Sequence, residues 1–367
     1  MILRNLMHVF DSIARVHHAA DWDNVGLLVG DPKTKVRTAM LCIDLTGPVL
    51  AESKRHRAQL VLAYHPPLFK PPTSLTPQSA PILWDALKAR LSLYSMHTAL
   101  DVARGGTNDV LAEILGMTST GPIEPAQGSG TVKVVAFTPA ANVEAVIHSA
   151  FACGAGIIGN YSECSFRTDG EGTFFGSEAS TPRVGHKGYH ERVPEVRVEL
   201  SCPMSCLEDV LCVIREVHPY EEPAIDVYPM ITQPHSGMGR VGEFSKPVTE
   251  QTLITRIKRE TGVKHVLVAR PHGRDAQTEV RRAACAAGSC GDMWKDAAGS
   301  NATFYLTGEM KHHEALAAAR AGLTVVCVGH SNSERPVLSR LARRLGEEVP
   351  DVRWLVSETD RDPFEIL

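Results

Sequence analysis

Three short apolar runs in the first third of the chain are separated by segments with helical periodicity. The runs are long enough to be buried strands and comprise TAMLCIDLT (38–46), LVLAYH (60–65) and LSLYSMH (91–97). Apolar residues at the spacing of amphipathic helices occur near 47–57, 80–90 and 106–116. This alternation predicts a parallel sheet that is flanked by helices.

The middle of the chain has a different order of elements. A linker rich in Gly, Pro and Ser, TSTGPIEPAQGSG (118–130), leads into it. The expected elements are KVVAFTP (133–139), a helix over 141–152, two Gly-rich turns, EVRVELSCP (195–203), a helix over 205–217 and AIDVYPM (224–230). Two successive β-α-β arrangements indicate a ferredoxin-like α+β sandwich.

The α/β alternation returns after a second Gly-rich joint, PHSGMGRVGE (234–243). Its strand candidates, each expected to precede a helix, are HVLVARP (265–271), ATFYLTGE (302–309) and LTVVCVGH (323–330). We therefore predict one α/β domain with a mostly parallel sheet, interrupted by an α+β insert. The expected boundaries are 1–124 and 237–367 for the α/β domain and 131–231 for the insert.

Composition narrows the functional classes. The net charge of -4 and the pI near 6.5 provide no basic field, so neither a nucleic-acid nor a membrane partner is expected. No apolar stretch is long enough to span a bilayer. The nine cysteines include no C-x-x-C pair, which disfavours zinc-ribbon and disulfide frameworks and indicates reduced thiols in a cytoplasmic protein.

Three of the apolar runs end in histidine, at His65, His97 and His330. Side chains at the carboxyl ends of parallel strands converge on a ligand crevice. Asp101 and Glu334 follow the second and third histidines after four residues, a spacing that puts both side chains on one face of a helix. Imidazole and carboxylate together are ligands for zinc, iron or manganese, so these strand ends predict a metal site.

Simpler interpretations compete with this one. A single histidine at a strand end is usually a hydrogen-bonded polar residue. The segment 331–334 is also a capping-box pattern, which would give Glu334 a structural role. That box would place Pro336 inside the helix, whereas a cap at Ser333 puts the proline in the first turn and leaves Glu334 free to bind.

Other polar residues have weaker patterns. Asp44 and Glu309 end apolar runs. Each is predicted either to support the site, by holding a metal ligand in place or by transferring a proton, or to be a helix cap or a surface ion pair. The remaining candidates are His17-His18 and His312-His313-Glu314 as surface or interface residues, HPYEEP (218–223) as a packing or contact segment, and CAAGSCG (285–291) as a weak phosphate cradle.

Long segments of the chain resemble the NIF-three-like proteins, whose bacterial members are often called GTP cyclohydrolase 1 type 2 homologues. In the α/β domain the similar segments are DWDNVGLLVGDP (21–32), YHPPLF (64–69), MHTALDVARGGTND (96–109), GMGRVGEF (237–244), TGEMKHHEAL (307–316) and GHSNSERP (329–336). In the insert they are AGIIGNYSECSF (155–166), EGTFFGSEASTPRVGHKG (171–188) and HPYEEPAIDVYP (218–229). The resemblance therefore covers almost the whole chain.

This resemblance implies a toroidal homohexamer with a PII/CutA-like insert and a site for two divalent metal ions, zinc, iron or manganese. By motif, His65, Asp101 and Glu334 would hold one ion, and His330 with the shared Glu334 the second. His97 would be a further ligand or a proton carrier. The chain departs from many bacterial members at Tyr64, where they carry histidine. Tyr64 would be a metal ligand as a phenolate, but a phenol is a poorer ligand than an imidazole, so the departure also allows a mononuclear site.

Two functions follow from these expectations. The first is a metal-dependent hydrolase of a small nucleotide or phosphoester, with GTP ring opening suggested by the family name; the ions would activate water and polarise the substrate. The alternative is a non-catalytic ring that carries metal or regulates a partner, with an insert that senses a ligand.

Overall fold

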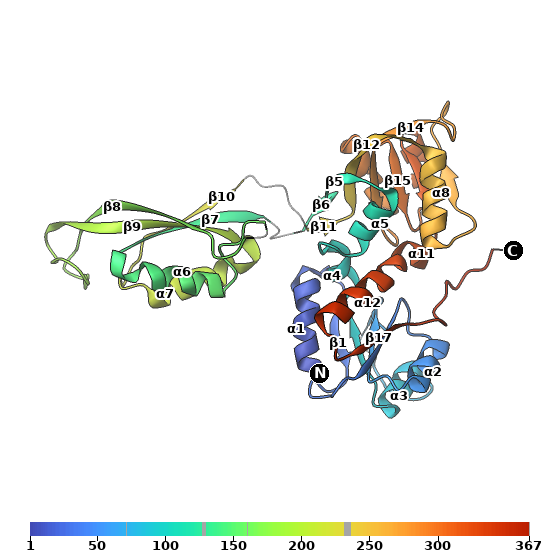
Figure 1. Ribbon diagram of the computed structural model, residues 1–367, viewed down its shortest axis with the longest axis horizontal. Coiled ribbons are helices and arrows are strands. Elements are labelled where there is room, and N and C mark those ends of the chain that lie inside the picture. The colour runs from blue at the N-terminus through green and yellow to red at the C-terminus, as the bar shows by residue number, and fades with distance from the viewer. Residues whose placement is uncertain (71, 127–129, 160, 231–235, 367) are drawn as a thin grey trace. The chain divides into compact units, whose positions relative to one another are not determined.

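The computed structural model describes residues 1–70, 72–126, 130–159, 161–230 and 236–366 (Figure 1). The chain divides into two compact units. The first unit combines Met1–Ala126 with His235–Leu367, and the second is Gln127–Pro234. Among the described residues, no helix combines the length and apolar character needed to cross a membrane.

The first sheet of the first unit contains the three apolar runs of the N-terminal segment. Its strand order is β1 (Gly26–Val29), β4 (Ser92–Ser95), β3 (Leu60–Ala63), β2 (Thr38–Cys42) and β17 (Arg353–Val356). All neighbours are parallel except β1, which is antiparallel to β4. The helices of this half are α1 (Leu3–Ile13), α2 (Gly47–Arg55), α3 (Pro81–Lys88), α4 (His97–Val102) and α5 (Thr107–Leu115). Strands β3 and β4 are buried throughout, as continuous apolar runs predict.

A second sheet contains the C-terminal runs. Its order is β13 (Leu267–Ala269), β16 (Thr324–Cys327), β15 (Phe304–Thr307), β14 (Glu279–Ala286), β12 (Arg240–Thr249) and β5 (Thr118–Gly121). Only β14, β15 and β16 are parallel neighbours. The helices of the C-terminal segment are α8 (Glu250–Thr261), α9 (Trp294–Gly299), α10 (His312–Arg320), α11 (His330–Glu334) and α12 (Pro336–Glu348). Helix α12 packs against β2 and β17 of the first sheet, whereas α5 packs against β12 and β14 of the second.

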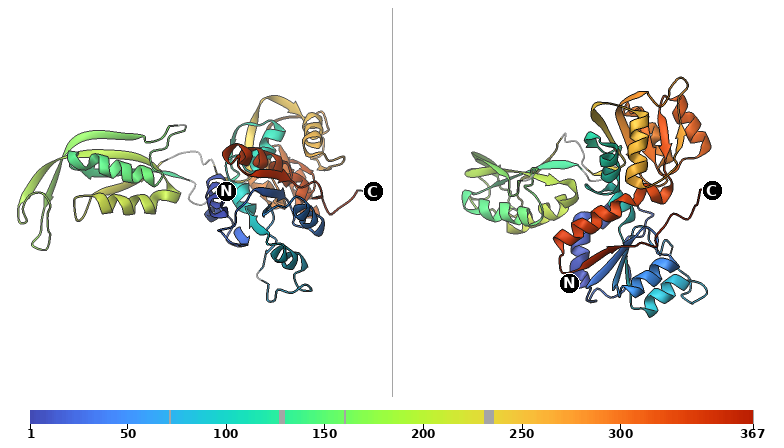
Figure 2. Two further views of the ribbon diagram at one scale, coloured as in Figure 1. Left: turned by 60° about the horizontal axis from the view of Figure 1, so that its bottom comes forward. Right: turned by 45° about the vertical axis from the view of Figure 1, so that its right-hand side comes forward.

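The α/β domain thus has two mixed sheets where one mostly parallel sheet was expected. In the right-hand view of Figure 2 the blue strands of the first sheet and the orange strands of the second lie apart. The run at 265–271 does not precede a helix, because β13 is an antiparallel edge strand that leads to β14. The expected linker at 118–130 also contains strands: β5 joins the second sheet, and β6 (Glu124–Pro125) pairs with β11 (Gly237–Met238).

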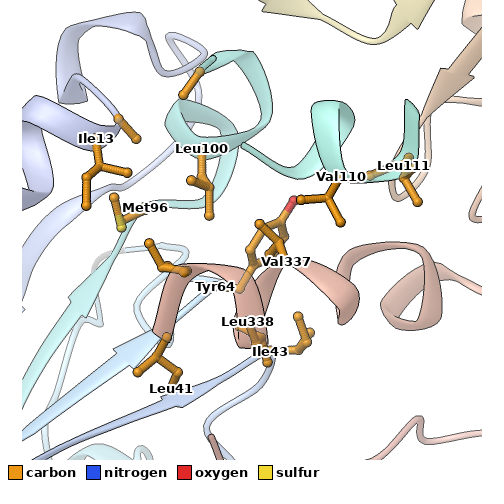
Figure 3. Close-up of a cluster of buried hydrophobic side chains, with 14 of the residues drawn as sticks. Ile13, Leu41, Ile43, Tyr64, Met96, Leu100, Val110, Leu111, Val337 and Leu338 are labelled. Atoms are coloured by element: carbon orange, nitrogen blue, oxygen red, sulfur yellow. The ribbon is translucent and has the colours of Figure 1, made fainter. Parts of the chain in front are cut away.

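One apolar cluster packs between elements of both halves. Tyr64 at the end of β3 lies among Val110 and Leu111 of α5 and Val337 and Leu338 of α12 (Figure 3). Each fully buried side chain of this size contributes on the order of 2 kcal/mol by leaving water. Because α12 comes late in the chain, this cluster fixes the C-terminal part against the strand ends of the N-terminal part.

The start of α12 differs from the predicted cap. Pro336 is in the first turn, as predicted, but Ser333 does not cap the helix. The Ser333 hydroxyl donates to the carbonyl of His330 at 2.7 Å and accepts from the backbone N–H of Gly288 at 2.8 Å. Ser333 therefore connects α11 to the loop after β14, an interaction that a local capping rule does not consider.

The second unit is an antiparallel sheet with two helices. Its elements are β7 (Thr131–Thr138), α6 (Val143–Ala152), β8 (Ser165–Phe175), β9 (His190–Pro203), α7 (Leu207–Val217) and β10 (Ile225–Pro229), with strand order β10-β7-β9-β8. This is the order of a ferredoxin-like fold. Strand β8 lies where only Gly-rich turns were predicted; almost all of its residues are exposed, so it lacks the apolar alternation of a half-buried strand.

Candidate metal centre

Polar residues from the carboxyl ends of both parallel strand sets meet in the first unit. Asp44 and His65 follow β2 and β3 of the first sheet, and Glu309 and His330 follow β15 and β16 of the second. Glu334 lies one helical turn after His330, at the end of α11. The chain therefore brings together side chains that are separated in sequence by the whole insert.

His65, His330 and Glu334 form the centre of this site. Among the described residues they are the one group of three or more His, Cys, Asp or Glu whose ligand atoms all lie within 4.8 Å of one another. Nε2 of His65 is 3.3 Å from Oε2 of Glu334, and Nε2 of His330 is 3.2 Å from Oε1. Glu334 is only 3% exposed. Both imidazoles thus face opposite oxygens of one buried carboxylate.

Two further carboxylates form hydrogen bonds with the ring nitrogens that face away from Glu334. Nδ1 of His65 is 2.9 Å from Oδ1 of Asp44, and Nδ1 of His330 is 2.9 Å from Oε1 of Glu309. A carboxylate at one ring nitrogen fixes the ring and directs the other nitrogen toward a metal. Asp44 and Glu309, which the sequence suggested as supporting residues, occupy this position.

The carboxylates favour positive charge on both rings. Burial alone would lower the pKa of His65, but Asp44 and Glu334 raise it to about 10. Glu334 raises the pKa of His330 to about 9. Burial would raise the pKa of Glu334, yet the two histidines lower it. At neutral pH both rings are therefore protonated, and together they carry two positive charges. A divalent cation carries the same charge, so the surrounding carboxylates can balance either the two protonated rings or one ion.

The donor set and the packing around it fit a metal ion. Two imidazoles and a carboxylate are the three protein ligands of many catalytic zinc sites, and they also suit iron. Oε2 of Glu334 is buried and, apart from its ion-pair contact with His65, has no hydrogen-bond partner among the described residues, which leaves an acceptor available. A Cβ on Gly288 would lie 2.7 Å from Oε1 of Glu334, so the glycine leaves the carboxylate room.

His97 lies beside the three central residues but outside their group. Its ring is 5.2 Å from that of His65, centroid to centroid. Nδ1 is 2.8 Å from Oδ1 of Asp23, whose other oxygen accepts from the backbone N–H of Thr98. Asp23 was not predicted as a site residue, since it lies 74 residues from His97 and no local spacing connects them.

Asp101 and Tyr64 contact each other at the edge of the site. The Tyr64 hydroxyl donates to Oδ1 of Asp101, and both side chains are buried. Burial and the nearby carboxylates raise the pKa of Tyr64 well above its usual range, so it is a neutral phenol here. Burial raises the pKa of Asp101 to about 6, with a further contribution from Glu334. Asp101 is outside the group of three central residues.

The other polar candidates lie elsewhere or have other partners. His312 and His313 start α10, and His17 and His18 lie in a short 3-10 helix. The buried His218 of HPYEEP has Nε2 3.0 Å from the carbonyl of Phe137, a packing contact within the insert. The CAAGSCG loop reaches the site, because Gly288 in it lies against Glu334.

A cavity of about 890 Å³ opens from the centre. Asp44, His65, Glu309 and His330 line one end of it. The rest is formed by β13, the end of β16 and the C-terminal segment around Asp362. The space is large enough for a small-molecule ligand to approach both imidazoles.

Comparisons with known proteins agree with the architecture. The family model Duf34/NIF3 (NGG1p interacting factor 3) matches residues 1–363. The GTP cyclohydrolase 1 type 2 homolog of Listeria innocua is 31% identical over 365 residues, which cover 97% of this chain and 96% of the relative. NIF3-like protein 1 of Rattus norvegicus is 34% identical over 378 residues, covering 100% and 93%.

A solved structure shows the same similarity. The crystal structure of a Bacillus cereus protein related to NIF3 matches with a TM-score of 0.81 and 31% identity, covering 100% of this chain and 99% of that one. The mixed α/β fold is therefore that of NIF3 structures, and the resemblance drawn from the sequence motifs is confirmed. Since the family model spans nearly every residue, the chain belongs to the Duf34/NIF3 family.

Proposed function

We propose that this protein is a divalent-metal-dependent hydrolase of a small molecule. The observation that carries the proposal is the buried Glu334 between two imidazoles whose outer nitrogens are each held by a carboxylate, at the end of an open cavity. His65, His330 and Glu334 would hold the ion. A divalent ion bound there would supply the Lewis acidity that polarises a substrate oxygen and acidifies water.

The surrounding residues have distinct roles in this proposal. Asp44 and Glu309 orient the two ligand imidazoles and keep their Nε2 atoms directed inward. His97, held by Asp23, is close enough to the centre to carry a proton to or from the substrate. Asp101 would belong to a second ion, but its hydrogen bond from Tyr64 competes with that role.

The names of relatives suggest which substrates to test first. Several are called GTP cyclohydrolase 1 type 2 homolog, so GTP, other nucleotides and phosphodiesters form the starting panel. We expect turnover that follows metal content and is lost in His65→Ala and Glu334→Ala, with unchanged circular dichroism and assembly. Stoichiometric metal binding without turnover of any tested substrate would instead support a metal-carrying or regulatory protein.

We also propose an assembly, an origin for the insert and a location. A homohexameric ring follows from the family resemblance, and light scattering of the purified protein tests it. A PII/CutA-like origin of the insert is supported by its strand order β10-β7-β9-β8. Nine free cysteines fit the reducing cytoplasm.

A further inference from the structure

The cavity beyond the metal-centre residues has a mainly apolar wall. The residues that form it come from β13, the loops after β15 and β16, and the C-terminal segment: Val266, Leu267, Met310, Val328, Phe364 and Ile366. Several of them are unusually open to solvent, with Leu267 77% exposed and Phe364 85% exposed. A wall of this kind binds the apolar body of a ligand, while the polar end of the cavity fixes its orientation.

Apart from three histidines, His65, His265 and His330, the ionised side chains that line this cavity are acidic. Asp44, Glu309 and Asp362 line it, and no Lys or Arg is among the described residues that do. Lys264, Lys311 and Arg361 are sequence neighbours of lining residues, but all three are exposed and none lines the cavity. Sites that bind polyphosphates normally contain Lys or Arg side chains that pair with the phosphate oxygens.

A bound metal ion would not remove the excess of negative charge in and around the cavity. Six carboxylates lie in the cavity or within the hydrogen-bonded network around the centre, namely Asp23, Asp44, Asp101, Glu309, Glu334 and Asp362. With all six ionised, their formal charge is larger than that of two divalent ions. A ligand with several negative charges would therefore find positive partners only in the bound ions and the histidines, and would otherwise face carboxylates.

We propose that the cavity binds an uncharged or cationic organic molecule with an apolar body, and that it disfavours nucleoside triphosphates. This inference rests on the proposed function, because it assigns the substrate class of the same site. The bond to be hydrolysed would lie at the polar end, next to His65 and His330. The ring or chain of the substrate would contact Val266, Leu267 and Phe364.

Matched ligands that differ only in charge test the proposal. Calorimetry on the metal-loaded protein would compare guanosine with GMP and GTP, adenosine with AMP and 5′-amino-5′-deoxyadenosine, and benzyl alcohol with benzyl phosphate and benzylamine. We expect at least one uncharged or amine compound to bind about tenfold more tightly than its phosphorylated partner. Tighter binding of GTP than of guanosine would overturn the inference, as would no binding of any compound.

A charge inserted into the wall gives an independent test. Leu267 is exposed, so Leu267→Arg and its neutral control Leu267→Gln leave the core intact. We expect Leu267→Arg, but not Leu267→Gln, to gain GMP or benzyl phosphate binding by about tenfold, with the gain reduced by salt. No change between the two variants would show that the wall does not contact ligands. Binding is measured without turnover, so the inference can fail while the hydrolase proposal holds, and the reverse.

Discussion

The hydrogen bonds of single side chains determine what the centre can hold. The imidazoles of His65 and His330 each have one nitrogen on a carboxylate and the other facing Glu334. The pKa values of both histidines are raised, so a metal ion must displace protons when it binds. The affinity for metal should therefore depend on the residues that surround His65, His330 and Glu334 as well as on these three side chains.

Gly288 is one such group, and Gly288→Ala should prevent metal binding. The new Cβ would lie 2.7 Å from Oε1 of Glu334 and would displace the carboxylate. Gly273→Ala is a matched control, because its φ of +82° is as unfavourable for alanine as the +66° of Gly288, while nothing lies within 4 Å of its Cβ. Both variants should lose about 1 kcal/mol of stability. Equal metal content in the two purified variants would contradict this role of Gly288.

Tyr64 should set the number of ions. Its neutral hydroxyl donates to Asp101, which keeps that carboxylate from a second ion. We expect isothermal titration with zinc to give one tight ion per chain in the wild type and two in Tyr64→His, whose imidazole adds a ligand. Tyr64→Phe frees Asp101 but adds no ligand, so it should also bind one tight ion. Two tight ions in the wild type would show that Asp101 exchanges its tyrosine partner for metal.

At the scale of elements, the chain end is fixed by a buried carboxylate on α2. Glu52 accepts hydrogen bonds from the hydroxyls of Ser357 and Thr359 and from the backbone N–H of Glu358 and Thr359. Burial alone would raise its pKa, but these bonds lower it to about 2. The segment they hold continues to Asp362, which lines the cavity.

Glu52→Gln should therefore remove a pH-dependent part of the stability. A pKa that is lower in the folded than in the unfolded state stabilises above the unfolded value, near 4.5, and this contribution is lost as pH falls toward 2. Urea unfolding should show a loss of about 2 kcal/mol at pH 7 and almost none near pH 2. Glu113→Gln, at an exposed pair with Arg340, is the control. A pH-independent loss in Glu52→Gln would point to packing.

Elements with a strong local pattern were predictable from the sequence. Strand β3 is a continuous apolar run, β2 and β4 are short and mainly apolar, and helix α5 has a clear apolar face, so their positions follow from the local pattern. Strand β8 has no such pattern, because its stability comes from pairing with β9 along its whole length. The division of the α/β domain into two sheets depends on packing between distant segments, which periodicity does not encode.

The site was predictable to a similar extent. The rule that strand ends converge pointed to His65 and His330, and the four-residue spacing pointed to Glu334; the three lie together in the structure, while their role as metal ligands stays a prediction. The four-residue spacing also pointed to Asp101, but it could not show that Tyr64 occupies that carboxylate. Asp23 and Gly288 were missed as site residues, because each meets its partner only through the tertiary fold.

At the scale of the whole molecule, the two units have separate cores. The apolar cluster of the insert contains only residues between Val132 and Ile225. At the base of the insert, Pro125 of β6 pairs with Gly237 of β11, so the two chain segments that enter and leave it are adjacent. The first unit therefore has what it needs to fold without the second.

Replacing the insert between Pro125 and Gly237 by a short Gly-Ser linker should leave a folded, metal-binding protein. None of the residues of the metal centre comes from the insert, and the β6–β11 pair would close the short loop. We expect cooperative thermal unfolding and the metal stoichiometry of the intact chain. A soluble variant that binds no metal would show that the insert supports the centre.

The ligands of the centre come from both ends of the polypeptide, His65 early and Glu334 close to the C-terminus. During translation, the first ligand leaves the ribosome long before its partners exist. The complete set can form only when synthesis is nearly finished, so the proposed ion would enter late and would join the early and late parts of the chain. Loss of the ion would correspondingly loosen the junction between the beginning and the end of the polypeptide, and would expose it to proteases at that seam.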